Sequence, residues 1–360
     1  MSVEQDMDQP LAPYTTFGVG GPAAGLVTAT SRDELIGAVK AADACQEPVF
    51  VLSGGSNVLI GDDGFPGRVV RVATRGIEAV PGPIEVATSD DDAVYWQVAA
   101  GEPLDDVVAA GVDDGLAGLE TLSGIPGLTG AAPVQNVGAY GGEIATAVQC
   151  VRVWDRLSGT ERVMAAGVCG FGYRDSLFKR TRPAASPTGR FVVLEVVLRL
   201  TRGDLSAPVE YAELATALGV PLGAKAPLRD VREAVLSLRR AKGMVYDASD
   251  PDTHGAGSFF TNPLLTPTAA AGLPANAPRF LQADGRVKTS AAWLIDDAGY
   301  HKGYGHGPAR LSSKHVLACT NQGGATAADV IALAREVRDG VRAQFGVKLE
   351  PEPVLVGVTL

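Results

Sequence analysis

The chain has 360 residues, which is more than a single hydrophobic core normally holds and predicts two or three domains. Its formal net charge of −10 and sequence pI of about 5.0 disfavour a nucleic-acid backbone or an anionic membrane surface as a partner. The four cysteines form no Cys-x-x-Cys pair and only four histidines are present. We therefore expect reduced thiols, no disulfide framework and no metal site.

Neither an export signal nor a membrane segment is expected. The first ten residues are acidic and polar, whereas a secretory signal needs a basic and then an apolar run. The most apolar stretch, residues 191–200, contains Glu195 and Arg199 and is shorter than the ~20 residues of a membrane helix. These features predict a cytoplasmic protein.

Two helices can be predicted from their ends. Ser31 and Glu34 form a capping box, and the apolar positions Leu35, Ile36 and Val39 follow it. Near the end of the chain, Thr326 can cap a helix that Gly346 ends. The apolar face expected for this last helix consists of Val330, Leu333, Ala334, Val337, Val341 and Phe345.

Apolar runs predict the strands. Residues 49–52 are short, apolar and followed by glycine, as expected for a buried strand. Residues 191–200 are apolar enough for a strand inside a sheet. The other expected elements are strands at 84–87 and 94–100, a short helix at 104–111, and exposed loops rich in proline and alanine at 182–188 and 269–278.

The most informative stretch is residues 124–143, G-I-P-G-L-T-G-A-A-P-V-Q-N-V-G-A-Y-G-G-E, called here the glycine segment. Glycine lets the backbone approach a ligand with no Cβ in the way, and successive free N–H groups form a concavity for phosphate oxygens. The segment also carries apolar and amide side chains suited to a flat heterocycle, including Gln135, Asn136 and Tyr140. An ordinary surface loop is the alternative.

A second loop, Ser53-Gly54-Gly55-Ser56-Asn57, directly follows the 49–52 strand. Its glycine spacing is not the G-x-G-x-x-G of a dinucleotide-binding helix, and it lacks the lysine of a P-loop. Two such loops favour a nucleotide cofactor held by backbone N–H groups. Two unrelated turns remain the alternative.

Together with four further motifs, these loops resemble the UDP-N-acetylenolpyruvoylglucosamine reductase (MurB) family, flavoenzymes that make UDP-N-acetylmuramate for bacterial cell walls. The resemblance covers nearly the whole chain. The first three motifs also occur in the wider group of flavin-binding proteins, whereas the last three, in this order, are specific to the family. The motifs are T-T-F-G-V-G-G-P-A (15–23), S-G-G-S-N-V-L (53–59), the glycine segment, G-Y-R-D-S-L-F-K (172–179), G-S-F-F-T-N-P (257–263) and L-E-P-E-P-V (349–354).

The resemblance implies an α+β fold: a two-lobed FAD-binding domain of the vanillyl-alcohol-oxidase-like (PCMH) type and a C-terminal α/β substrate domain. The first lobe would cover residues 1–80 and be rejoined by 349–360, the second lobe 81–242, and the substrate domain 243–348. The chain is similar to the members with the longer second domain. A monomer is expected.

The implied cofactors are non-covalent FAD and, as electron donor, NADPH. By the same resemblance, the cofactor-binding residues are Ser53, Gly54, Gly55, Ser56, Asn57, Gly124, Ile125, Pro126, Gly127, Gly130, Gln135, Asn136, Gly138 and Tyr140. The substrate-binding residues would be Tyr211, Lys242 and Asn262, where Tyr211 can equally be a half-buried sheet tyrosine. Arg239 and Arg240 lie beside Lys242 and form either a solvated face or a local attraction for anionic ligands.

Three residues are implied as catalytic. Hydride delivery to an enolpyruvyl ether places negative charge next to a carboxylate, so the site needs a cation and an acid. Arg174 in G-Y-R-D would be the cation, with a structural ion pair to Asp175 as the alternative. Ser258 would be the proton donor, although the residues alone indicate a turn or cap serine.

Glu352 would be the third catalytic residue, orienting Arg174 or supplying a shared proton. Glu350 and Glu352 lie two apart on an extended segment, which predicts that they face the same side, and only the family motif selects the second. The chain departs from the family pattern at Pro353 and at Ser53, where relatives usually have glycine. If the Ser53 position required a positive φ, it would store ~1 kcal/mol or more of strain.

The function implied is the reduction of UDP-N-acetyl-3-O-(1-carboxyvinyl)glucosamine to UDP-N-acetylmuramate in peptidoglycan precursor synthesis. Two alternatives stay open on the sequence. The first is another flavin-dependent oxidoreductase of the same FAD-binding fold, such as an alcohol or sugar oxidase. The second is a non-enzymatic flavin or nucleotide-sugar binding protein.

Overall fold

A computed structural model describes residues 6–82, 92–184 and 186–360. The chain forms two compact units. Unit 1 comprises residues through Gln9, Ala23–Gly54 and Pro66–Ala241, and unit 2 comprises Pro10–Pro22, Gly55–Phe65 and Lys242–Leu360. The finer division into three domains stays a prediction; in the observed grouping, residues 349–360 belong with the C-terminal part of the chain.

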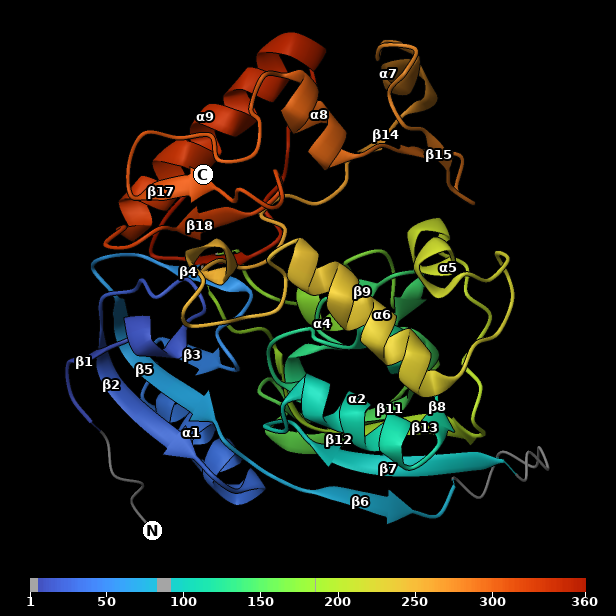
Figure 1. Cartoon of the computed structure of the whole chain (residues 1–360). Helices are drawn as coiled ribbons and strands as arrows, with labels where there is room; N and C mark the ends of the chain where they lie inside the picture. Colours follow the sequence, from blue (N-terminus) through green and yellow to red (C-terminus); the bar gives the residue numbers. More distant parts are fainter. Residues whose placement is uncertain (1–5, 83–91, 185) are drawn as a thin grey trace. The chain divides into compact units, whose positions relative to one another are not determined.

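The first sheet has the strand order β1-β2-β5-β3. Strand β3 is parallel to β5, and helix α1 packs its apolar face against this sheet (Figure 1). Ser31 caps α1 in a complete capping box with Glu34. The elements are β1 (Gln9–Pro10), β2 (Pro22–Ala29), α1 (Arg32–Ala44), β3 (Val49–Leu52) and β5 (Phe65–Val72).

A larger sheet in unit 1 has the order β12-β11-β13-β7-β6, with β8 also paired to β13. Its central strand β13 is antiparallel to both β11 and β7 and is buried along most of its length. The strands are β6 (Ile77–Val80), β7 (Ala93–Ala99), β8 (Leu116–Ala117), β11 (Val148–Asp155), β12 (Thr160–Ala165) and β13 (Phe191–Arg202).

Helices and a small hairpin complete unit 1. Helices α2 and α5 both contact α6, shown in yellow in Figure 1. The hairpin of β9 and β10 pairs Gly138 with Glu143 inside the glycine segment. These elements are α2 (Leu104–Asp113), η2 (Glu120–Leu122), η3 (Thr129–Ala131), β9 (Gly138–Ala139), β10 (Gly142–Glu143), η4 (Ile144–Thr146), α3 (Ala166–Cys169), α4 (Leu177–Arg180), α5 (Ala212–Leu218) and α6 (Leu228–Ala241).

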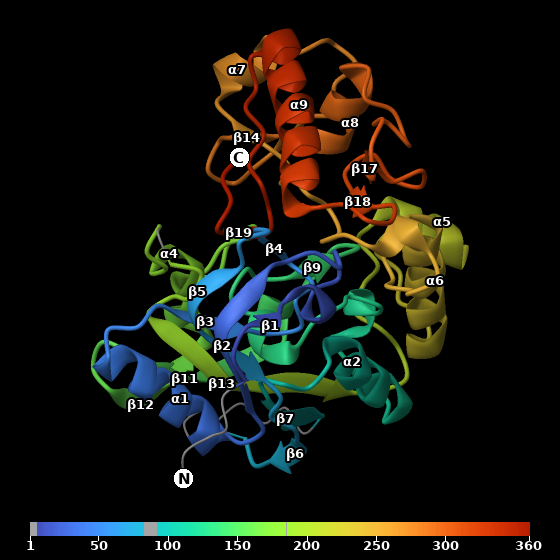
Figure 2. The same ribbon diagram turned by 90° about the vertical axis from the view of Figure 1, so that its left-hand side faces the viewer.

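Unit 2 is built around helix α9, which lies beside α8 and the β17–β18 ribbon (Figure 2). Strand β19, near the end of the chain, is parallel to β4. The elements are η1 (Ala12–Tyr14), β4 (Val58–Ile60), η5 (Pro251–Thr253), β14 (Leu264–Leu265), α7 (Pro267–Ala271), β15 (Phe280–Leu281), β16 (Val287–Lys288), α8 (Ala291–Asp297), β17 (Ala309–Leu311), β18 (Cys319–Asn321), α9 (Ala327–Phe345) and β19 (Val354–Val356).

Most expected elements are confirmed. Thr326 caps α9 in a capping box with Asp329, Gly346 ends the helix at φ 68°, and the expected apolar positions are buried, with Phe345 partly so. The strands at 49–52, 94–100 and 191–200 and the helix at 104–111 are present with small shifts of their ends. The expected strand at 84–87 lies outside the described residues.

The exposed loop expected at 269–278 is wrong in part. Thr266 caps α7 and Pro267 occupies its first turn, so the alanines that follow continue a helix. Ala270 is buried, and Leu273 and Ala277 are buried within the core of unit 2. In the other expected loop, Pro183 and Ala184 are exposed but Thr188 is buried, and its hydroxyl accepts the N–H of Val51 at 2.7 Å.

Candidate functional site

The two glycine loops touch each other inside unit 1. A Cβ on Gly54 would lie 2.7 Å from the Cα of Gly127 and 3.3 Å from the backbone nitrogen of Leu128. Gly127 itself has φ 107°, a conformation that other residues rarely adopt. The first loop therefore meets the glycine segment backbone to backbone.

Ser53, the residue before this contact, has a buried hydroxyl without a hydrogen-bond partner among the described residues. Because buried polar atoms are normally paired, this orphan marks a place for a ligand atom. The backbone of Ser53 is not in the left-handed region. Within this loop, Gly55 adopts the left-handed conformation, at φ 62°. The strain considered for Ser53 is therefore absent.

The start of the glycine segment is tied to two helices of unit 1. The N–H of Gly124 donates to Asp105 of α2 at 2.6 Å. Asp105 also receives two hydrogen bonds from Arg232 of α6, at 2.6 and 3.1 Å. Burial raises the pKa of Asp105, but the Arg232 hydrogen bond and charge and the Gly124 N–H outweigh it and hold the pKa below its usual value.

Asn136 and Tyr140 have φ 48°, in the left-handed region, although neither is glycine. Such a conformation costs about 1–2 kcal/mol for most residues, less for asparagine, and strained residues of this kind cluster at functional sites. The Asn136 side chain is fully buried. Its amide nitrogen donates to Glu143 at 2.7 Å and to the Gly172 carbonyl at 3.0 Å, and its oxygen accepts the Ala145 N–H at 3.1 Å. A cofactor contact of Asn136 would therefore come from its backbone.

Arg174 is a third left-handed residue, at φ 52°. Its guanidinium donates to the carbonyls of Gly138, at 2.6 Å, and Asn136, at 3.4 Å. Asp175, the alternative partner considered from the sequence, forms an ion pair with Arg180. The expected cation is thus attached directly to the glycine segment.

Tyr211 also lies beside the glycine segment. Its ring packs edge-to-face against Tyr140 with centroids 5.4 Å apart, and it remains 42% exposed. Burial raises the pKa of Tyr140 to about 12 and lowers the pKa of the nearby Arg239 guanidinium to about 10. The two neighbouring arginines therefore differ in their surroundings. Arg239 lies near Tyr140 and is partly buried, whereas Arg240 is exposed.

The other expected catalytic residues belong to unit 2. Ser258 is half-buried between Gly257, at φ 68°, and the fully buried Phe259. The Glu352 N–H donates to the Phe259 carbonyl at 2.9 Å, so the structure brings Ser258 and Glu352 onto adjacent backbone segments.

The two candidate glutamates differ in their surroundings. Glu350 is exposed and pairs with Lys348 at 2.9 Å, whereas Glu352 is half-buried. Residues 352 and 353 form a bend before β19 begins. That both glutamates face the same side stays a prediction.

Lys242 and Asn262 also belong to unit 2, whereas Tyr211 belongs to unit 1. The Asn262 side-chain oxygen accepts the N–H of Ala291 at 2.9 Å, at the start of α8. This contact orients the amide of Asn262. The roles of these three residues in substrate binding stay predictions.

The comparisons with known proteins cover nearly the whole chain. A family model described as FAD binding domain matches residues 23–164, and one described as UDP-N-acetylenolpyruvoylglucosamine reductase, C-terminal domain, matches residues 250–356. The chain is 52% identical to the UDP-N-acetylenolpyruvoylglucosamine reductase of Thermobifida fusca, with 98% of each chain covered. The chain belongs to the UDP-N-acetylenolpyruvoylglucosamine reductase family.

Two further relatives agree with this family assignment. The UDP-N-acetylenolpyruvoylglucosamine reductase of Cutibacterium acnes is 52% identical over 98% of this chain and 90% of its own length. The solved structure of the UDP-N-acetylenolpyruvylglucosamine reductase of Thermus caldophilus matches with a TM-score of 0.64 and 30% identity over 99% of each chain. The α+β fold with an FAD-binding domain is therefore confirmed.

The residues of unit 1 fit the FAD of this reductase family. The Ser53 hydroxyl is an unpaired buried polar atom, and a Cβ on Gly54 or Gly130 would collide with backbone or Ala100 at 2.7 Å or less. Only glycine at these positions allows the loops to pack this closely, which places the orphan Ser53 hydroxyl beside backbone that can bind a diphosphate.

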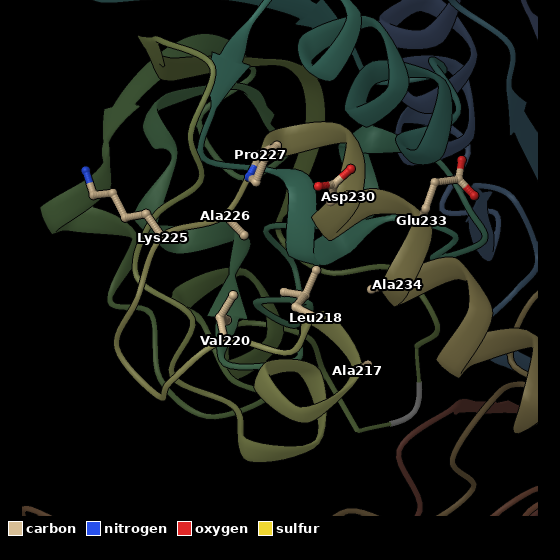
Figure 3. A pocket seen from close by; sticks show the side chains of 9 residues that line it. All are labelled: Ala217, Leu218, Val220, Lys225, Ala226, Pro227, Asp230, Glu233 and Ala234. Carbon is tan, nitrogen blue, oxygen red and sulfur yellow. The ribbon is translucent and has the colours of Figure 1, made fainter.

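A separate hollow of about 450 Å³ lies between α5 and α6 (Figure 3). It contains none of the expected site residues. Its lining consists of Ala217, Leu218, Val220, Lys225, Ala226, Pro227, Asp230, Glu233 and Ala234. The carboxylates of Asp230 and Glu233 disfavour the anionic ligands of a UDP-sugar reductase family, so we do not assign them to this hollow.

The described residues contain no helix long and apolar enough to cross a membrane. Within the same part of the chain, no group of three or more histidine, cysteine, aspartate or glutamate side chains is arranged to hold a metal ion.

Two residues tied into this site were not predicted. Asp105 and Glu143 hold the glycine segment through contacts to Gly124 and Asn136. Glu143 directly follows the last glycine of the segment, and this position in the sequence does not indicate a structural role. Only the pairing of β9 with β10 shows that Glu143 lies opposite Gly138.

Proposed function

We propose that this chain is a UDP-N-acetylmuramate dehydrogenase that uses FAD and NADPH to reduce UDP-N-acetyl-3-O-(1-carboxyvinyl)glucosamine. The observation that carries the proposal is Arg174, a left-handed arginine whose guanidinium is held by Gly138 and Asn136 of the glycine segment. The relatives that match the whole chain bear the name of this reductase. The product would be UDP-N-acetylmuramate, a precursor of peptidoglycan, made in the cytoplasm by a monomer.

FAD would be held by the two glycine loops. Backbone N–H groups near Gly54 and Gly127 would contact its diphosphate, and the orphan hydroxyl of Ser53 would contact one of its polar atoms. Bound FAD would supply the redox chemistry that carries a hydride equivalent from NADPH to the enolpyruvyl group. We propose non-covalent binding, with the remaining cofactor residues as expected from the sequence.

Arg174 would hold the substrate carboxylate. A guanidinium is always charged and can bind a carboxylate in two places, so it stabilises the negative charge that develops there during reduction. The two carbonyls that accept its N–H groups fix its plane in advance. Such preorganisation lowers the reorganisation needed in the transition state.

Ser258 would donate a proton to the substrate carbon next to the carboxylate. A hydroxyl is a weak acid, but a carbanion-like carbon is a strong base, so the transfer is favourable. Glu352 lies on the adjacent segment through its backbone bond to Phe259 and would orient the reacting groups or return the proton. Tyr211, Lys242 and Asn262 would bind the UDP diphosphate.

The test separates the two half-reactions. NADPH should bleach the yellow protein without oxygen, and the enolpyruvyl nucleotide should then re-oxidise it. Ser258→Ala should leave bleaching unchanged and slow re-oxidation about 10²–10⁴-fold, as expected for loss of a general acid. Ser249→Ala, at an exposed serine whose hydroxyl donates to Asp247, is the matched control.

Three results would contradict the proposal. Equal slowing of both half-reactions in Ser258→Ala would indicate a structural serine. A protein that is reduced by alcohols or sugars and re-oxidised only by oxygen would be the oxidase that the sequence left open, and one that binds flavin without either half-reaction would be a binding protein.

A further inference from the structure

We propose that Glu143 is a positioning residue for Arg174 and acts through the side chain of Asn136. The inference rests on the proposed role of Arg174 in holding the substrate carboxylate. It assigns to Glu143 the task of fixing both the turn that carries Arg174 and the carbonyls that hold its guanidinium.

The first step is the orientation of the Asn136 amide. Its nitrogen faces two acceptors, the Glu143 carboxylate at 2.7 Å and the Gly172 carbonyl at 3.0 Å, and its oxygen faces the Ala145 N–H at 3.1 Å. A flipped amide would place oxygen against both acceptors and nitrogen against a donor. The bond to the charged Glu143 is the strongest type of the three, so Glu143 is the main group that fixes this orientation.

The second step is the turn that carries Arg174. Gly172 and Asp175 exchange two backbone hydrogen bonds, of 2.9 and 3.1 Å, so residues 173 and 174 form the tip of a tight turn. The Asn136 amide binds the Gly172 carbonyl at the base of this turn. Lys179 binds the Arg174 carbonyl at 2.8 Å on the other side. The turn is thus clamped while Arg174 is held at φ 52°.

The third step is the guanidinium. It donates to the carbonyls of Asn136 and Gly138. Gly138 is also the residue paired with Glu143 across the β9–β10 hairpin, and a Cβ on Gly138 would lie 2.8 Å from Cγ of Glu143. Glu143 therefore contacts β9, which supplies the Gly138 carbonyl. It also contacts the side chain of Asn136, whose backbone carbonyl is the second acceptor of the Arg174 guanidinium.

Loss of the Glu143 carboxylate would remove the charged acceptor of a buried amide whose backbone is left-handed. Asn136 would then be free to relax, which moves both its own carbonyl and the base of the Arg174 turn. A misplacement of ~1 Å in a positioned catalytic group is enough to lower a rate about 10²-fold.

The test is a set of variants in the FAD-loaded, full-length protein. Glu143→Ala should slow re-oxidation by the enolpyruvyl nucleotide about 10–100-fold while FAD content and reduction by NADPH stay at parent values. Glu143→Gln, which retains an oxygen acceptor of the same reach but loses the charge, should recover part of the rate. Glu143→Asp, which retains the charge but withdraws it by one methylene, should remain slow; if Asp is as fast as the parent, the charge alone matters and the inference is wrong.

The double variant decides between positioning and general destabilisation. In an Arg174→Lys background, Glu143→Ala should add little further slowing, because residues that act through one group are non-additive. Glu102→Ala is the control: its carboxylate accepts an N–H within unit 1, as that of Glu143 does, but from the backbone of Gly76, at 2.6 Å. This variant should leave re-oxidation unchanged.

The outcomes separate this inference from the proposed function. If re-oxidation is slow in Arg174→Lys but normal in Glu143→Ala, only the role of Glu143 is overturned. The same holds if the two single slowing factors multiply in the double variant. Normal re-oxidation in Arg174→Lys would overturn the role of Arg174 itself. If Glu143→Ala does not fold, the contrast between the Gln and Asp variants carries the same decision.

Discussion

The contact between Gly54 and Gly127 allows a sharp test of the cofactor site. Gly54→Ala adds one methyl group whose carbon would lie 2.7 Å from the Gly127 Cα and 3.2 Å from its carbonyl carbon. Gly54 is not among the positive-φ glycines, so alanine meets no dihedral penalty there. The substitution therefore isolates the steric contact, unlike changes at Gly127, whose φ of 107° adds strain of its own.

The magnitude follows from the overlap. Carbon atoms pack at about 3.5–4.0 Å, so the two loops must separate by about 1 Å. Overpacking of this kind typically costs 1–3 kcal/mol. If this energy is lost from the FAD-binding conformation, the Kd for FAD should rise about 5–150-fold, since ~1.4 kcal/mol corresponds to a factor of ten. A Gly54→Val change should abolish binding.

The assay is titration of the apoprotein with FAD by flavin fluorescence, together with the Tm of each apoprotein. Gly37→Ala is the matched control, because a Cβ on this residue of α1 meets no atom within 4 Å. It should stabilise the helix by about 0.5–1 kcal/mol and leave the Kd unchanged. The reasoning fails if Gly54→Ala binds FAD as tightly as the parent.

Two further predictions concern stability and thiol chemistry. Arg190 donates to both Asp155 oxygens, at 2.7 and 2.6 Å, and holds the pKa of this carboxyl well below its usual range, so the pair stabilises the fold above the unfolded-state pKa. The difference in unfolding free energy between parent and Asp155→Asn should therefore be large at pH 7 and shrink as pH falls below ~4; urea titrations that give a pH-independent difference would contradict this. Burial raises the pKa of the Cys169 thiol to about 11 and of the Cys319 thiol to about 12, so at pH 8 a thiol reagent should label exposed Cys45 first and these two only after unfolding. Cys45→Ser should remove the fast phase.

Elements with local signals could be predicted from the sequence. The capping boxes at Ser31 and Thr326 are decided within four residues, so the starts of α1 and α9 were found correctly. The buried strand β13 was found because it is apolar along most of its length. The helix α7 was missed because its proline and alanines carry no apolar periodicity. The burial of Leu273 and Ala277 in the core of unit 2 was missed because it depends on contacts distant in the sequence.

The supports of the candidate site could not be predicted in this way. Asp105 and Arg232 are 127 positions apart, and their contact places α6 against the Gly124 end of the glycine segment. Glu143 and Gly172 meet at Asn136 from two different motifs. Such contacts depend on topology, and a single sequence records the residue types without recording which of them meet.

The backbone of the site explains why sequence rules fail there. Five described residues other than glycine have positive φ, and three of them, Asn136, Tyr140 and Arg174, lie in the candidate site. Glycine would remove about 1–2 kcal/mol of strain at each, but it would also remove the amide that joins two motifs, the ring beside Tyr211 and the guanidinium. A left-handed residue with a functional side chain is therefore retained only where neighbours hold it. The hydrogen bonds from Asn136 to Glu143 and Gly172, and from Lys179 to Arg174, supply that support. The strain and its supports thus point to the same residues as the chemistry.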